Sequence, residues 1–171
     1  SKFSNSPNIP WINVPFFNLT SAPITTVPVL SLTTTFAFSK VGDTSKFSKR
    51  EIKVLNLFAY TGGATVACLS AGASVCHVDS SKGMVAWAKE NVASSGLQEK
   101  HVRYIVDDVV KFVNREIRRG NKYDAIIMDP PSYGRGPTGE VWKIEENIDS
   151  FVELTRNVLS DTPLFFLLNS Y

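Results

Sequence analysis

The sequence has 171 residues, of which 43% are hydrophobic, and a formal net charge of +2. This length is sufficient for one domain with its own core and too short for two full domains. The small net charge creates no global field that calls for a nucleic-acid or membrane partner. No apolar run reaches the roughly eighteen residues of a membrane span.

The two cysteines, Cys68 and Cys76, lie in apolar runs and have neither metal-site nor redox-motif spacing. We interpret them as small buried hydrophobic residues. Two free thiols suit a reducing compartment, so we expect a cytoplasmic protein without a metal.

The first 48 residues differ in composition from the rest. They contain five of the nine prolines, with serine and threonine between them. No helical period appears, and proline restricts strands to sheet edges. The pattern predicts an irregular Pro/Ser/Thr-rich segment over 1–48, followed by a single domain over 49–171.

From Lys49 onward, apolar strands alternate with helical periods. The expected strands are 53–58, 74–79, 102–106, 123–128 and 164–169; the expected helices run from 62 to about 71, from about 84 to 92, from 109 to 117 and from 148 to 159. This alternation predicts an α/β fold with a mainly parallel sheet and right-handed crossovers. Ligands of such sheets bind at the carboxyl ends of the strands.

A glycine pair follows the first expected strand. In Phe58-Ala59-Tyr60-Thr61-Gly62-Gly63, glycine allows a sharp turn and a close approach of the backbone to a ligand. The helix that begins there offers free N–H groups to a carboxylate. An ordinary strand-to-helix turn is the alternative, and the third glycine of a dinucleotide fingerprint is absent.

Acidic residues end the next two strands. Asp79, with Ser80 beside it, ends the second strand, where an acid can accept from both ribose hydroxyls; a helix cap is the alternative. Asp107 and Asp108 end the third strand. One of them can cap the following helix while the other accepts from an adenine amino group, and we favour Asp108 for adenine.

These motifs resemble the class I S-adenosylmethionine (SAM) dependent methyltransferases. The run from Leu57 to Gly63 is similar to their first motif, and its Tyr-Thr-Gly form resembles bacterial ribosomal-RNA large-subunit methyltransferases, a family that includes cytosine-C5 enzymes. The runs 106–108, 111–113 and 129–136 strengthen the match. The resemblance implies a Rossmann-like fold and SAM as cofactor, with Gly62 and Gly63 at its methionine part, Asp79 at its ribose and Asp108 at its adenine. The cofactor-binding candidates are Phe58, Tyr60, Thr61, Gly62, Gly63, Asp79, Ser80, Asp107 and Asp108.

An Asp-Pro-Pro loop follows the fourth expected strand. Its prolines fix the backbone and lack N–H donors, so their carbonyls are expected to be free to accept. A rigid loop of acceptors suits an amino group held beside a methyl donor, and Tyr133 can stack on a flipped base. The alternative is a stiff turn with a packed tyrosine. The catalytic candidates are Asp129, Pro130, Pro131 and Tyr133.

The target atom is left open by the sequence. Cytosine-C5 chemistry needs a cysteine thiolate, which in such relatives lies just after the fifth strand, whereas this sequence has Asn169-Ser170-Tyr171 there. Methylation of a ring nitrogen or exocyclic amine needs no such nucleophile. The resemblance also implies seven strands, so the expected sheet is truncated after the fifth.

Basic residues gather on the third helix and just beyond it, at Lys111, Arg115, Arg118, Arg119 and Lys122. They can contact phosphates, but we favour a solvated helix face, since the dipole favours positive charge near a helix C-terminus. Neither His77 nor His101 has a sequence partner that suggests catalysis.

Three functions compete at this point. The first is a SAM-dependent methyltransferase acting on RNA, and the second is a catalytically incomplete fragment that binds SAM or RNA. The third, a nicotinamide-dependent oxidoreductase, is disfavoured by the glycine pattern and the Asp-Pro-Pro loop.

Overall fold

The computed structural model describes residues 50–136 and 139–169 of the chain. The predicted irregular segment 1–48 lies outside the described residues, so its prediction is untested.

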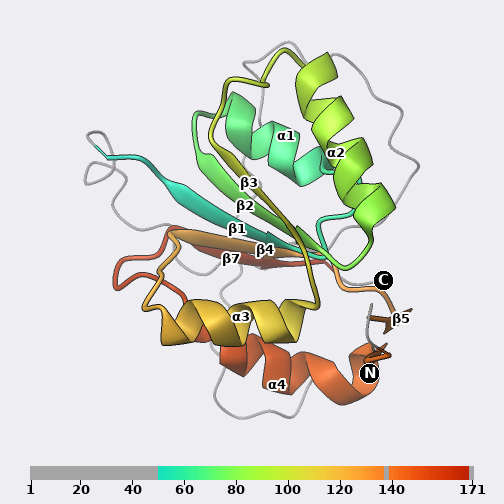
Figure 1. The fold of residues 1–171 in the computed structure, drawn as a ribbon. Helices are drawn as coiled ribbons and strands as arrows, with labels where there is room; N and C mark the ends of the chain where they lie inside the picture. The colour runs from blue at the N-terminus through green and yellow to red at the C-terminus, as the bar shows by residue number, and fades with distance from the viewer. Residues whose placement is uncertain (1–49, 137–138, 170–171) are drawn as a thin grey trace.

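Five parallel strands form the central sheet, in the order β3-β2-β1-β4-β7 (Figure 1). They are β1 (Lys53–Leu57), β2 (Ser74–Asp79), β3 (Val102–Val106), β4 (Ala125–Met128) and β7 (Phe165–Leu168). Every neighbouring pair is parallel. The α/β class and the parallel sheet are therefore confirmed, and each expected strand is present with its ends shifted by two residues at most.

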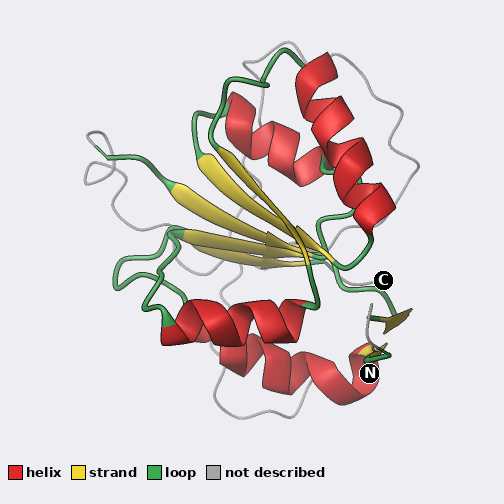
Figure 2. Cartoon of the chain, viewed as in Figure 1, coloured by secondary structure: helices red, strands yellow, loops and turns green. Residues whose placement is uncertain are grey.

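Helices cover both faces of this sheet (Figure 2). The helices α1 (Gly63–Ser70) and α2 (Lys82–Ser94) lie on one face, and α3 (Val109–Arg118) and α4 (Ile144–Arg156) lie on the other. Successive side chains of a strand point to opposite faces. Val54 accordingly packs in the core on the α1 side, while Leu55 and Leu57 pack in the core on the α3 side.

Helix α4 begins four residues before its expected start and ends three residues before its expected end. Its first turn carries the exposed Glu145 and Glu146, which have no apolar period but favour a helix N-terminus through the dipole. Val158 is buried without being helical, and its carbonyl accepts from the Tyr123 N–H at 2.8 Å. The buried Val158 follows the helix at an apolar position that matches the helical period, so the sequence pattern predicted one more turn than the structure has.

A small antiparallel hairpin, absent from the sequence-based expectation, follows the Asp-Pro-Pro loop. It pairs β5 (Tyr133–Arg135) with β6 (Val141–Lys143). Strands of three residues, one of them with glycine at its centre, give too short a pattern to recognise. This hairpin leads directly into α4 and lies beside the carboxyl ends of the parallel strands (Figure 1).

Candidate active site

The order in which strands are added to the sheet reverses at β1, between β1 and its neighbour β4. From β1 the chain passes outward through β2 to β3, and it then returns to place β4 on the other side of β1. In sheets of this kind, the loops that leave two such neighbouring strands usually diverge and form the ligand crevice. Leu57 pairs with Met128 at their ends. The glycine loop and the Asp-Pro-Pro loop therefore start side by side.

The glycine loop has an unusual backbone. Phe58 and Tyr60 have φ angles of 52° and 49°, and Gly62 has 82°. Non-glycine residues rarely adopt this left-handed region, and such conformations cluster at functional sites. A Cβ at Gly62 would lie 2.9 Å from the Cβ of Ala88 on α2, whereas a Cβ at Gly63 would meet nothing within 4 Å. Gly62 thus allows close packing of two helices, and Gly63 faces open space that a ligand can fill.

Asp79 links the second strand to this loop. Its Oδ2 accepts from the Tyr60 N–H and its Oδ1 from the Ser81 N–H, both at 2.8 Å. Each carboxylate oxygen has a further lone pair. The half-buried Ser80 follows directly. The carboxylate is thus held in a fixed orientation and can still accept from the two hydroxyls of a ribose.

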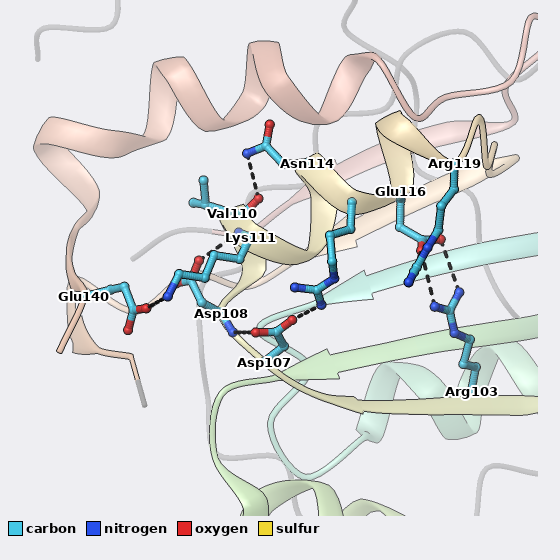
Figure 3. Close-up of polar contacts among 10 residues, drawn as sticks. Arg103, Asp107, Asp108, Val110, Lys111, Asn114, Glu116, Arg119 and Glu140 are labelled. Carbon is cyan, nitrogen blue, oxygen red and sulfur yellow. Dashed lines mark hydrogen bonds and ion pairs between the residues drawn. The ribbon is translucent and has the colours of Figure 1, made fainter. Parts of the chain in front are cut away.

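The two acids after β3 have different partners (Figure 3). Asp108 caps α3, since its Oδ1 accepts from the Lys111 N–H at 2.9 Å. The expected division, in which the acid at the adenine is not the helix cap, therefore does not hold for Asp108. Asp107 accepts from the Asp108 N–H through Oδ1 and from the Arg115 guanidinium through Oδ2. Each oxygen of Asp107 therefore already accepts one hydrogen bond. Within the described chain, nothing donates to the Oδ2 of Asp108, so that oxygen can accept a hydrogen bond from an adenine amino group.

Exposed apolar side chains flank these acids. Tyr60, Val106 and Val110 are 61%, 47% and 36% exposed. They come from the glycine loop, the end of β3 and the first turn of α3. Apolar surface beside a few fixed acceptors is the usual lining of a nucleoside site.

The basic residues of α3 are mostly engaged inside the chain (Figure 3). Arg115 pairs with Asp107, Lys111 with Glu140 of the hairpin region, and Arg119 with the buried Glu116. Arg103 of β3 adds a second pair to Glu116. This distribution agrees with a structural role for the helix face more than with a phosphate-binding stripe.

Asp129 opens the Asp-Pro-Pro loop at the end of β4. Its backbone N–H donates to the Leu57 carbonyl at 3.4 Å, and its Oδ1 accepts from the Asn169 amide at 2.9 Å. Loss of hydration raises the pKa of its carboxyl, and the Asn169 amide opposes that rise. Asn169, which follows β7, is a partner that sequence reasoning did not identify.

The expectation that both proline carbonyls of the loop are free is wrong for Pro131. Its carbonyl accepts from the indole N–H of Trp142, in the middle of β6, at 2.8 Å. The Ser132 carbonyl accepts from the Ile144 N–H at 3.0 Å. The hairpin thus fixes the second half of the loop. Tyr133 is 52% exposed, so the alternative of a packed tyrosine is also wrong.

An aromatic cluster lies beneath the two loops. The Trp142 ring lies 4.8 Å from the Phe58 ring and 5.5 Å from the Phe151 ring, measured between centroids. Phe58 and Phe151 lie 5.8 Å apart. Phe58 was expected at the cofactor site. Its half-buried ring packs against the core, and it connects the glycine loop to the hairpin.

A buried polar chain supports the glycine loop from the opposite side. The Asn56 amide donates to the Thr65 hydroxyl at 3.0 Å, and that hydroxyl lies 2.9 Å from His77 Nδ1. His77 is fully buried, and burial lowers its pKa to about 4. Its neutral ring packs below Gly62. The partner of His77 is therefore structural, and only the fold reveals it.

Within residues 50–136 and 139–169, no three His, Cys, Asp or Glu side chains are grouped as metal ligands would be. No helix of this part is both long and apolar enough to cross a bilayer.

A family model described as S-adenosylmethionine-dependent methyltransferase matches residues 42–154. Ribosomal RNA large subunit methyltransferase K/L of Shewanella baltica is 43% identical over 82 residues, which are 47% of this chain and 11% of that protein. Ribosomal RNA large subunit methyltransferase I of Enterobacter sp. is 39% identical over 85 residues, which are 49% of this chain and 22% of that protein. The chain thus matches less than a quarter of the length of these curated relatives.

Two solved structures carry the comparison to the fold. The crystal structure of the SAM-dependent methyltransferase from Agrobacterium tumefaciens aligns with a TM-score of 0.68 at 45% identity, over 71% of this chain and 39% of that one. SMU.776, solved in complex with S-adenosylhomocysteine (SAH), aligns with a TM-score of 0.59 at 30% identity, over 64% of this chain and 28% of that one. The expected Rossmann-like methyltransferase fold is confirmed.

Proposed function

Because the chain belongs to the family of SAM-dependent methyltransferases, we propose that it transfers the methyl group of SAM to a base of RNA, with ribosomal RNA as the first substrate to test. The similarity to two large-subunit ribosomal RNA methyltransferases supports this substrate class. One observation carries the proposal. The glycine loop and the Asp-Pro-Pro loop start side by side at the ends of β1 and β4, where the strand order of the sheet reverses.

The residues present fit SAM. Open space at Gly63 suits the methionine part at the N-terminus of α1. The fixed carboxylate of Asp79 suits the ribose hydroxyls, and the Asp108 Oδ2 suits the adenine amine. Phe58, Thr61, Ser80 and Asp107 then shape or support this site from the same loops.

When bound, SAM would supply a methyl group on its sulfonium: the acceptor nitrogen gains the methyl group as the bond to sulfur breaks, SAH is the leaving group, and the proton of the nitrogen passes to solvent. Asp129 and the Pro130 carbonyl then hold the acceptor by accepting from its N–H groups. The exposed ring of Tyr133 stacks on the base and keeps it out of its own helix. The chain contributes position more than covalent chemistry, and positioning can supply much of such a rate enhancement.

We propose an exocyclic amine or ring nitrogen as the target atom. The two cysteines of the sequence lie on α1 and in the middle of β2, away from the Asp-Pro-Pro loop. Burial raises the pKa of each to about 11. A thiol with such a pKa is protonated at neutral pH and cannot attack a cytosine ring. Neither cysteine is therefore suited to cytosine-C5 chemistry.

The test is transfer of a radiolabelled methyl group from SAM to purified large-subunit ribosomal RNA, with DNA and bulk protein as competing acceptors. The proposal predicts label in RNA, and nucleoside analysis should place it on nitrogen. Label in DNA or protein instead would refute the substrate class. Binding of SAH without transfer to any acceptor would favour the catalytically incomplete fragment.

A further inference from the structure

Trp142 of the hairpin contacts both loops of the proposed active site, namely the Asp-Pro-Pro loop and the glycine loop. It lies in the middle of β6, between the exposed Val141 and Lys143, and is only 9% exposed. A tryptophan that is buried usually finds a partner for its N–H group. Here the partner is the Pro131 carbonyl at 2.8 Å.

The same indole ring contacts the cofactor side of the site. Its centroid lies 4.8 Å from that of Phe58, which has a φ of 52°. Surrounding contacts must hold a backbone conformation of this kind, because a non-glycine residue disfavours it. Phe151 of α4 completes the contact from below, at 5.5 Å from the indole.

We propose that Trp142 is a positioning residue that sets the Asp-Pro-Pro loop relative to the cofactor loop. The indole N–H fixes Pro131, and the ring face fixes Phe58. A change in the glycine loop on cofactor binding is thereby passed to the loop that holds the acceptor. This inference rests on the proposed function, in which the Asp-Pro-Pro loop holds the methyl acceptor.

One other contact supports a rigid link rather than incidental packing. The Ile144 N–H donates to the Ser132 carbonyl at 3.0 Å, one residue beyond Pro131. The residue that follows β6 is thus bonded to the loop as well, while the indole N–H joins β6 itself to Pro131.

The Trp142→Phe variant tests the proposal, because phenylalanine keeps an aromatic ring and lacks the N–H donor. Amide hydrogen exchange measured by NMR reports the local effect at Ile144. The amides of Ser74 and Tyr123 at the other end of the strands serve as references. We expect exchange at Ile144 to become about fivefold faster, as the loss of one hydrogen bond implies, with the reference amides unchanged. Trp87→Phe is the matched control, since Trp87 is 51% exposed on α2.

A second arm measures the coupling. SAH should slow exchange at Ile144 in the wild-type protein but not in Trp142→Phe, while its affinity for both proteins stays within about threefold. Unchanged exchange at Ile144 in the variant, or equal acceleration of the reference amides, would overturn the positioning role. Equal protection by SAH in both proteins would overturn the coupling. The exchange measurement without SAH needs no methyl acceptor, so its outcome is separate from failure of the RNA proposal.

Discussion

The carboxylate of Asp79 accepts a hydrogen bond from the Tyr60 backbone N–H at 2.8 Å. This contact joins the end of β2 to the loop that follows β1, at a residue whose φ is 49°. One acidic side chain thus shapes the glycine loop and faces the place where the ribose of SAM is proposed to bind.

Replacing Asp79 with alanine should abolish measurable binding of SAM, because it removes the ribose acceptor and the support of Tyr60 together. Loss of charged hydrogen bonds of this kind corresponds to a decrease in affinity of at least about 100-fold. Isothermal titration calorimetry with SAM and SAH is the measurement. Asp149→Ala, at an exposed position on α4, is the control. Undiminished affinity of Asp79→Ala would refute the ribose assignment.

The two glycines of the loop should respond differently to alanine. Gly62→Ala places a Cβ 2.9 Å from the Cβ of Ala88 in a backbone with a φ of 82°. The free energy of unfolding should therefore decrease by about 2 kcal/mol. Gly63→Ala meets no neighbour and lies in a helix, so its stability should stay the same or rise slightly. Its methyl group would instead occupy space proposed for the cofactor. Thermal unfolding and SAH titration of both variants separate the two effects; a stable Gly62→Ala protein would contradict the packing role.

The order of strands, helices and glycine turns could be predicted because each element has its own period and punctuation. The acids at the ends of β2 and β3 could be located for the same reason, since strand ends follow from the apolar runs. The contacts of Trp142 with Pro131 and Phe58 could not be predicted, because they depend on a hairpin of three-residue strands that has no recognisable period. The Asp107–Arg115 contact shows a related limit. Helical spacing could place Arg115 on α3. It could not predict which acid Arg115 would contact, because that depends on where the end of β3 places Asp107.

Stability should fall as the pH decreases from about 6.5 toward 4.5. Burial holds the folded-state pKa of His77 at about 4, whereas an exposed histidine titrates near 6.5. The unfolded chain therefore binds a proton in this range that the folded chain does not, and the stability is fully present only above the unfolded pKa. Urea unfolding at several pH values measures the slope of the free energy of unfolding against pH. It should diminish in His77→Phe and persist in His101→Gln; an equal slope in both variants would rule out His77 as its source.

The buried carboxylate of Glu116 should be essential to the fold. Burial alone would raise its pKa, but hydrogen bonds from Tyr123, Arg103, Asn121 and Arg119 lower it instead, so the group is charged and fully paired. Glu116→Gln leaves two arginines facing a neutral amide and should reduce the free energy of unfolding by about 3 kcal/mol. Arg118→Gln, exposed on the same helix, is the control for denaturant unfolding. Equal stability of the two variants would show that the cluster contributes little.

In the proposed mechanism, the Asp-Pro-Pro loop of this chain directs methyl transfer to RNA. Transfer of labelled methyl groups from SAM to ribosomal RNA tests this with the wild-type protein, Asp129→Ala and Asp161→Ala, and SAH affinity is measured on the same preparations. Asp161 is exposed between α4 and β7 and serves as the control. We expect labelled RNA from the wild-type protein and from Asp161→Ala. For Asp129→Ala we expect a loss of at least about 100-fold in rate, with SAH affinity retained. Equal labelling of RNA by Asp129→Ala, or no labelling by a wild-type protein that binds SAH, would contradict the proposed mechanism.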